Sequence, residues 1–226
     1  FSRHSRGPES PDALPAPLPT IVVLVDLAGF DTAAPGVAAA RVEALIDLLR
    51  AVRPARILVA ASNDSSSRWA GNRDVHARAE LAGYRYVTDA GHDYDIVDLG
   101  DDVRDNGFAA TSALAGTPAA TVWADADLRI VMAGLRGDAA DGYGAALETL
   151  LTALPLADTQ LHYRQRRAVG EVAVALMQAM PPQFALIDAA ARFGMVVASR
   201  NILLADYAAA LKFGVDPAAS ALFAAV

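Results

Sequence analysis

The strongest constraint on the fold is a strand–helix–strand pattern near the start of the chain. Ile21–Leu27 (IVVLVDL) is a continuous apolar run rich in β-branched residues, which is typical of a strand buried on both faces. Val37–Val52 then has apolar residues at helical spacing, and Pro54 ends this segment. Arg56–Ala61 (RILVAA) has the character of a second strand. Two strands joined by a helix predict a parallel pair with a right-handed connection.

The same alternation continues toward the end of the chain. Further strands are expected at Tyr94–Leu99, Leu128–Ala133, Phe184–Asp188 and Met195–Ala198, with a short segment, Thr121–Ala124, before the second of these. Helices are expected at Arg73–Ala82, Gly142–Leu154, Arg164–Met180, Leu203–Phe213 and Ala218–Ala225. Strands that alternate with helices predict a single α/β domain over residues 21–226, with a mostly parallel sheet flanked by helices.

The first 20 residues differ from the rest of the chain. They hold five prolines and no helical or strand period. Proline-rich segments favour extended geometry and cannot build a core. We therefore expect residues 1–20 to form an extended arm that packs along its own domain or a neighbouring chain. Because Phe1 is not a translation start, we also expect the chain to be trimmed or processed.

Composition excludes several classes of protein. At 54% hydrophobic and 20% charged residues, the chain is too apolar to be disordered. Its apolar runs fall short of the roughly 18–20 residues that span a bilayer. The net charge of −7 argues against a non-specific nucleic-acid binder. With no cysteine, the chain has neither a disulfide nor a cysteine nucleophile. We expect a cytoplasmic protein that binds no nucleic acid and has no membrane span.

Candidate functional residues follow the predicted strands, because ligands of open α/β sheets bind beyond the carboxyl ends of the strands. Asp26 ends the first strand and Asp188 ends a later one. If the chain is an enzyme, these carboxylates are its candidate acid and base. Arg136 follows the strand at Leu128–Ala133 in a glycine-rich loop and is a candidate anion clamp. The alternative is that all three belong to ordinary turns and loops.

A polar run directly after the second strand is the other candidate. The hydroxyl and amide side chains of Ser62, Asn63, Ser65 and Ser66 suit a phosphate or carboxylate ligand. The run has no glycine or lysine, so it is not a nucleotide-binding loop, and a polar turn is the alternative. The four histidines are not at the spacing of a metal-binding pair, so no metal site is predicted. The sequence leaves the cofactor open.

Three stretches of the chain resemble the family called domain of unknown function 362. They are Arg41–Leu49 followed by Ala55–Ala60, then Phe184–Asp188, and finally Val196–Asp206 followed by Phe213–Pro217. The resemblance covers roughly residues 20–226 and implies the α/β fold. Within the last two stretches, Asp188, Asn201 and Asp206 become site candidates, and helix capping or packing is the alternative role for the aspartates.

The chain departs from that family at three places. A Lys-Pro-Asn is usual near the end of the first strand, where this chain has Val25–Phe30. A Lys-x-His is usual after the middle strand, where Leu135–Asp138 stands here. Many members also carry cysteine-rich segments. We therefore predict a divergent member that is a non-catalytic binding or structural subunit of a homo- or hetero-oligomer, joined through its arm.

The alternative is an enzyme that acts on a small anionic metabolite, with aspartate acid/base residues and an arginine clamp. In that case Asp26, Ser62, Arg136 and Asp188 should converge on one pocket. An Arg136 that points to solvent, with strand ends plugged by apolar side chains, would favour the non-catalytic subunit.

Overall fold

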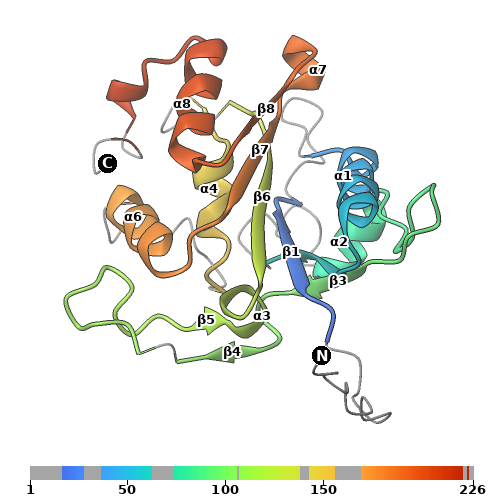
Figure 1. Ribbon diagram of the computed structural model, residues 1–226. Helices are drawn as coiled ribbons and strands as arrows, with labels where there is room; N and C mark the ends of the chain where they lie inside the picture. The colour runs from blue at the N-terminus through green and yellow to red at the C-terminus, as the bar shows by residue number, and fades with distance from the viewer. Residues whose placement is uncertain are drawn as a thin grey trace, which may run out of the picture.

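The computed structural model describes residues 17–27, 37–62, 74–105, 107–137, 143–155, 169–220 and 223. Within them lies a six-stranded sheet of order β3-β2-β1-β6-β7-β8 (Figure 1). Its strands are β1 (Thr20–Val25), β2 (Arg56–Ala61), β3 (Asp95–Asp98), β6 (Leu128–Gly134), β7 (Phe184–Asp188) and β8 (Val196–Ser199). The predicted α/β fold with a mostly parallel sheet is confirmed.

The sheet reverses its order beside β1. The chain runs outward from β1 through β2 to β3, and then returns to place β6 on the other side of β1. Every neighbouring pair from β3 to β7 is parallel, with Val25 level with Met132 and Gly134 level with Asp188. The carboxyl ends of β1 and β6 therefore flank the topological switch point, where open α/β sheets bind their ligands.

Helices cover both faces of the sheet (Figure 1). One face packs against α1 (Ala39–Val52) and α2 (Val75–Leu81), and the other against α4 (Ala146–Leu151), α6 (Val169–Ala179) and α8 (Ile202–Phe213). Side chains of β1 alternate between the two cores: Val23 and Val25 face α1, whereas Val22 and Leu24 face α4. Because β1 is buried on both faces, it is apolar throughout.

Two short segments next to the sheet differ from the sequence pattern or add to it. β8 is an antiparallel edge strand, because the short α7 (Ala190–Phe193) is only a turn and returns the chain beside β7. Thr121–Ala124 is a helical turn, α3, after a small ladder of β4 (Val103–Arg104) and β5 (Ala119–Ala120).

Helix α4 starts later than predicted, because Gly144 is held in a backbone bridge with Arg136. The chain after α8 forms a 3-10 turn, η2 (Pro217–Ala219), and half of the last predicted helix lies outside the described residues, as do residues 1–16 of the arm. Of the helices that the structure describes, none has the length and apolar character needed to cross a membrane.

Candidate functional site

Asp26 and Arg136 meet across the topological switch point. Asp26 directly follows β1 and is 7% exposed. Arg136 lies two residues beyond β6, and its Nη1 donates a hydrogen bond to the Asp26 carboxylate. The arginine side chain is 14% exposed, so it does not point into solvent. The two residues picked out from separate strand ends thus form one buried ion pair.

Glu148, in the first turn of α4, holds the other side of the Arg136 guanidinium. Its Oε2 lies 3.1 Å from Arg136 Nη2, and its side chain is 3% exposed. Gly144 makes this contact possible, because a Cβ on Gly144 would lie 1.8 Å from Glu148 Oε2. Gly144 also exchanges two backbone hydrogen bonds with Arg136, of 2.8 and 3.1 Å, which fix the base of the loop between them.

The group of Asp26, Arg136 and Glu148 holds one positive and two negative side chains. Burial lowers the pKa of the Arg136 guanidinium, but the negative charges of Asp26 and Glu148 more than offset this and keep the pKa above its ordinary value. Arg136 is therefore a permanent cation between two carboxylates. The opposite charges offset the cost of burying the arginine. Removing the arginine would leave two buried carboxylates without a cation beside them.

A second ion pair crosses the same edge of the sheet. Arg41, in the first turn of α1, donates from Nη1 to Asp188 Oδ2 at 2.5 Å. Asp188 also accepts the backbone N–H of Ala190 at 3.0 Å through its other oxygen. Its side chain is 4% exposed, whereas that of Arg41 is 41% exposed. The pair ties the start of α1 to the end of β7, over the carboxyl end of the sheet.

Asp26 and Asp188 do not form a pair of carboxylates. By the alternation along β1, Asp26 follows Val22 and Leu24 toward the α4 face. Along β7, Ala185 and Ile187 face α4, so Asp188 faces the α1 side, where Arg41 binds it. The two carboxylates share one edge of the sheet but lie on opposite sides of it.

Ser62 directly follows β2 at the same edge. It is 6% exposed, and its carbonyl accepts a 2.6 Å hydrogen bond from Arg78 Nη2. Its buried Oγ has no hydrogen-bond partner within the described part of the chain. The other residues predicted for this polar run, Asn63, Ser65 and Ser66, lie outside the described residues.

The start of α1 offers backbone donors at this edge. The helix has 14 residues, and its N-cap, Ala38, provides no side-chain hydrogen bond. The first turn contains no acidic residue, and its cation is Arg41. Helix N-termini attract anions through their free N–H groups and the helix dipole. Here that terminus is placed at the switch point by the ion pair between Arg41 and Asp188.

Asn201 and Asp206 serve helix ends. Asn201 caps α8, its side-chain oxygen accepting from the N–H groups of Leu203 and Leu204 at 2.9 and 3.2 Å. Asp206, on α8, is fully buried and caps α4 from outside that helix, with 2.8 and 2.9 Å hydrogen bonds from Ala146 and Leu147. Burial raises the Asp206 pKa to about 7, although these two hydrogen bonds act in the opposite direction.

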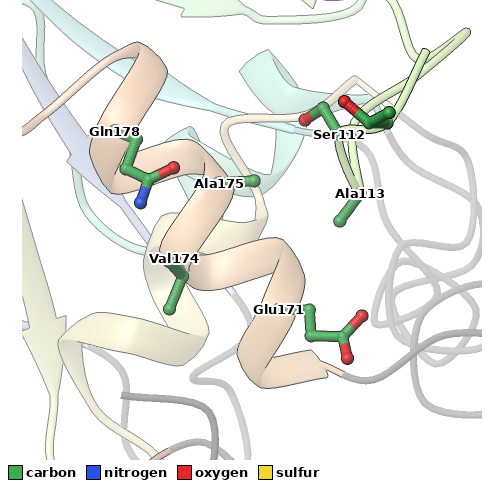
Figure 2. Close-up of a pocket in the computed structure, with 7 residues that line it drawn as sticks. Ser112, Ala113, Glu171, Val174, Ala175 and Gln178 are labelled. Atoms are coloured by element: carbon green, nitrogen blue, oxygen red, sulfur yellow. The ribbon is translucent and has the colours of Figure 1, made fainter. Parts of the chain in front are cut away.

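A pocket of about 430 Å³ lies elsewhere, beside α6. Figure 2 shows Glu171 and Ala175 of α6 on one side of it, with Ser112 and Ala113 on the other. None of the residues predicted from the sequence lines this pocket. Within the described ranges, no three His, Cys, Asp or Glu side chains are grouped so that they could hold a metal ion.

A model of one protein family matches residues 21–211, which is most of the chain, and it is described as a domain of unknown function (DUF362). The chain belongs to the DUF362 family. A comparison with curated proteins finds no match. The DUF362 assignment agrees with the resemblance in the sequence and states no activity.

The sequence pattern did not identify Arg41, Glu148 or Gly144 as part of this DUF362 site. One signal for Arg41 was present, because a cation in the first turn of a helix opposes the helix dipole and needs a nearby carboxylate. Glu148 is an isolated acid within the apolar run Ala145–Leu151, which indicates a buried partner. The partner of Arg41 lies 147 residues away along the chain, and that of Glu148 lies across a turn of the fold, so local patterns could not name either.

Proposed function

We propose that this chain is a non-catalytic domain that binds a small anionic molecule at the carboxyl ends of β1 and β6. The observation that carries the proposal is the N-terminus of α1, which reaches the switch point of the sheet and whose N-cap, Ala38, gives it no side-chain hydrogen bond. An anion placed there would accept backbone N–H groups and interact favourably with the helix dipole. A cytoplasmic location remains a prediction from the sequence.

The two ion pairs support this proposal by giving the edge a fixed shape. Arg136 bridges β1, β6 and α4 through Asp26 and Glu148. Arg41 links α1 to β7 through Asp188. Both connections are made by side chains, so the switch point is held by contacts that do not depend on the ligand. A preorganised site loses less entropy when a ligand binds.

Catalysis by Asp26 and Asp188 is the alternative, and the geometry favours it less. Each carboxylate is paired with its own arginine, and the two face opposite sides of the sheet. A substrate would have to displace an arginine before either carboxylate could take its proton. The enzyme alternative expects Asp26→Asn and Arg136→Ala each to lower turnover at least about tenfold, through loss of the acid or base in one case and of the anion clamp in the other.

We also propose that α8 packs against a second copy of this chain. Leu204, Tyr207 and Leu211 lie on one side of α8 and are 62%, 48% and 56% exposed. Next to α8 lies β8, the antiparallel edge strand of the sheet. An apolar helix face beside a strand edge suits an isologous contact between two copies.

Sedimentation of the Leu204→Glu variant tests this contact. Leu48 on α1 is also 62% exposed, so Leu48→Glu is the matched control. We expect wild type and Leu48→Glu to be dimers and Leu204→Glu to be a monomer. A monomeric wild type would contradict the proposal.

Changing the N-cap of α1 tests the ligand site without removing a buried group. Ala38 is exposed and has the extended backbone of an N-cap, so an Asp there would cap the helix and repel an anion. We expect calorimetric titration with citrate and with inorganic phosphate to show binding to wild type that weakens at least about tenfold in Ala38→Asp.

Asn201→Asp is the control, because it adds the same charge at the N-cap of another helix, α8, which follows the end of β8 near the amino end of β7. It should bind as wild type does. Binding that is equal in wild type and Ala38→Asp would overturn the proposed site, as would a wild type that binds neither anion.

A further inference from the structure

A cluster of two cations and two aromatic rings lies at the same edge of the sheet. Arg192 of α7 places its guanidinium carbon 4.1 Å from the ring centre of Phe213 and 5.3 Å from that of Phe193. Lys212 of α8 places its Nζ 5.6 Å from the centre of Phe193. Both cations therefore share the Phe193 ring, whose face attracts positive charge.

The fold brings this cluster to the switch point from two directions. α7 follows the carboxyl end of β7, next to Asp188. Because β8 is antiparallel to β7, α8 begins near the amino end of β7 and runs back. The contacts of Phe213 and Lys212 with Arg192 and Phe193 then bring the end of α8 beside α7. The Phe213 ring also packs 3.8 Å from the position a Cβ would take on Gly137, the residue after Arg136.

Arg192 and Lys212 differ from the other cations at this edge in their partners. Arg41 and Arg136 each bind a buried carboxylate. Neither Arg192 nor Lys212 forms an ion pair with any carboxylate that the structure describes, and both are exposed. Among the described residues, the two cations of the aromatic cluster are therefore not held by a carboxylate as Arg41 and Arg136 are.

We propose that Arg192 and Lys212, positioned on Phe193 and Phe213, bind a phosphate group of the ligand. Guanidinium and ammonium groups are the side-chain partners of phosphate, and two of them match its dianionic charge. The aromatic rings restrict the two long side chains and leave their N–H groups open to an anion. This inference rests on the proposed binding function and narrows the ligand to a phosphorylated small molecule with a second anionic group for the α1 terminus.

The chain provides a direct reporter, because Lys212 is its single lysine. Reductive methylation with a ¹³C label keeps the positive charge of the side chain and gives one lysine signal in the NMR spectrum. Inorganic phosphate should shift this signal saturably, and chloride at the same ionic strength should not. Absence of a saturable shift, or an equal shift with chloride, would overturn the proposal.

The matched variants are Arg192→Gln and Arg200→Gln. Arg200 makes the same kind of contact, 5.7 Å from the ring centre of Phe184, but Phe184 lies at the amino end of β7, away from the aromatic cluster. We expect Arg192→Gln to weaken phosphate binding at Lys212 at least about tenfold, and Arg200→Gln to leave it as in wild type. Equal binding in wild type and Arg192→Gln would contradict the subsite.

Two readouts separate this inference from the function on which it rests. The lysine signal reports the aromatic cluster, whereas calorimetry on Ala38→Asp reports the α1 terminus. One outcome is a lysine signal that responds to phosphate and depends on Arg192, while Ala38→Asp has no effect on the calorimetric titration. It would support the phosphate subsite and contradict the site at the α1 terminus. A lysine signal that does not respond to phosphate, together with weaker calorimetric binding in Ala38→Asp, would contradict the subsite alone.

Discussion

Gly144 is the residue on which the buried contact between Arg136 and Glu148 depends. A methyl group there would meet Glu148 Oε2 at 1.8 Å, and the Glu148 side chain is 3% exposed. We expect Gly144→Ala to lower the free energy of unfolding by about 1–3 kcal/mol through overpacking. Urea denaturation measures this change.

Gly137→Ala is the matched control, because its new methyl group would meet only Phe213 Cζ, at an ordinary 3.8 Å. Its free energy of unfolding should stay within about 1 kcal/mol of wild type. Equal effects of the two substitutions would contradict the account of the Arg136 contact.

Asp206 makes stability depend on pH. Its pKa is raised from 3.8 to about 7, chiefly by burial, so the folded protein holds this proton more tightly than the unfolded chain. The stability that the protonated side chain contributes is complete below about pH 4 and is lost as the pH rises to about 7. We expect the stability of wild type relative to Asp206→Asn to fall across this range.

Chemical denaturation at several pH values measures that difference. Asp95→Asn is the control, because the Asp95 side chain is 61% exposed and its loss should produce no such decline. A constant difference between wild type and Asp206→Asn from pH 4 to pH 7 would show that Asp206 is not held in this buried state.

Sequence patterns identified three of the five residues in the two ion-pair groups at the carboxyl edge of the sheet. Asp26 and Arg136 follow apolar strand-like runs. They became site candidates because ligands bind beyond the carboxyl ends of strands. Glu148 and Arg41 lie in the first turns of helices, where a sequence gives no information on which strand end they face. Asp188 was identified without its partner for the same reason.

The ends of the helices determine the site more than their middles do. Helix α1 lacks a side-chain cap at Ala38, whereas α8 has one from Asn201. We expect Ala38→Asp to raise the free energy of unfolding by about 1 kcal/mol, because it supplies the missing cap and complements the helix dipole. Thermal denaturation checks the change.

Ala38→Ser separates the cap from the charge. Ala38→Ser should add part of the same stability, because a serine hydroxyl also caps the helix. It carries no charge, so it should not repel an anion. A loss of stability in Ala38→Asp would mean that the backbone N–H groups at the start of α1 already have hydrogen-bond partners. That result would contradict their role as donors to an anion.

The predicted elements hold where a strand is buried and apolar, as in β1, β2 and β6. Their alternation with helices was enough to predict a parallel α/β sheet. The direction of β8 was not predictable, because it depends on α7 having only four residues, and a short connection decides between a parallel and an antiparallel return. Boundaries such as the start of α4 were also missed, since a bridge between Arg136 and Gly144 sets them.

The whole molecule places two kinds of anion-attracting group at one edge of the sheet, the start of α1 and the cations on the aromatic cluster of α7 and α8. Between them lie the two arginines that Asp26, Glu148 and Asp188 hold. Segments from the start, middle and end of the chain supply them. The overall charge of −7 is therefore a poor guide to the local charge at this edge.

Native mass spectrometry of the protein, purified gently from its own source, tests the central claim most directly. We expect wild type to retain a small molecule that carries phosphate and is lost under stronger activation. The Ala38→Asp variant, expressed in the same cells, should appear at the mass of the chain alone. A wild type free of any small molecule, or a ligand retained equally by Ala38→Asp, would contradict a binding site at the carboxyl ends of β1 and β6.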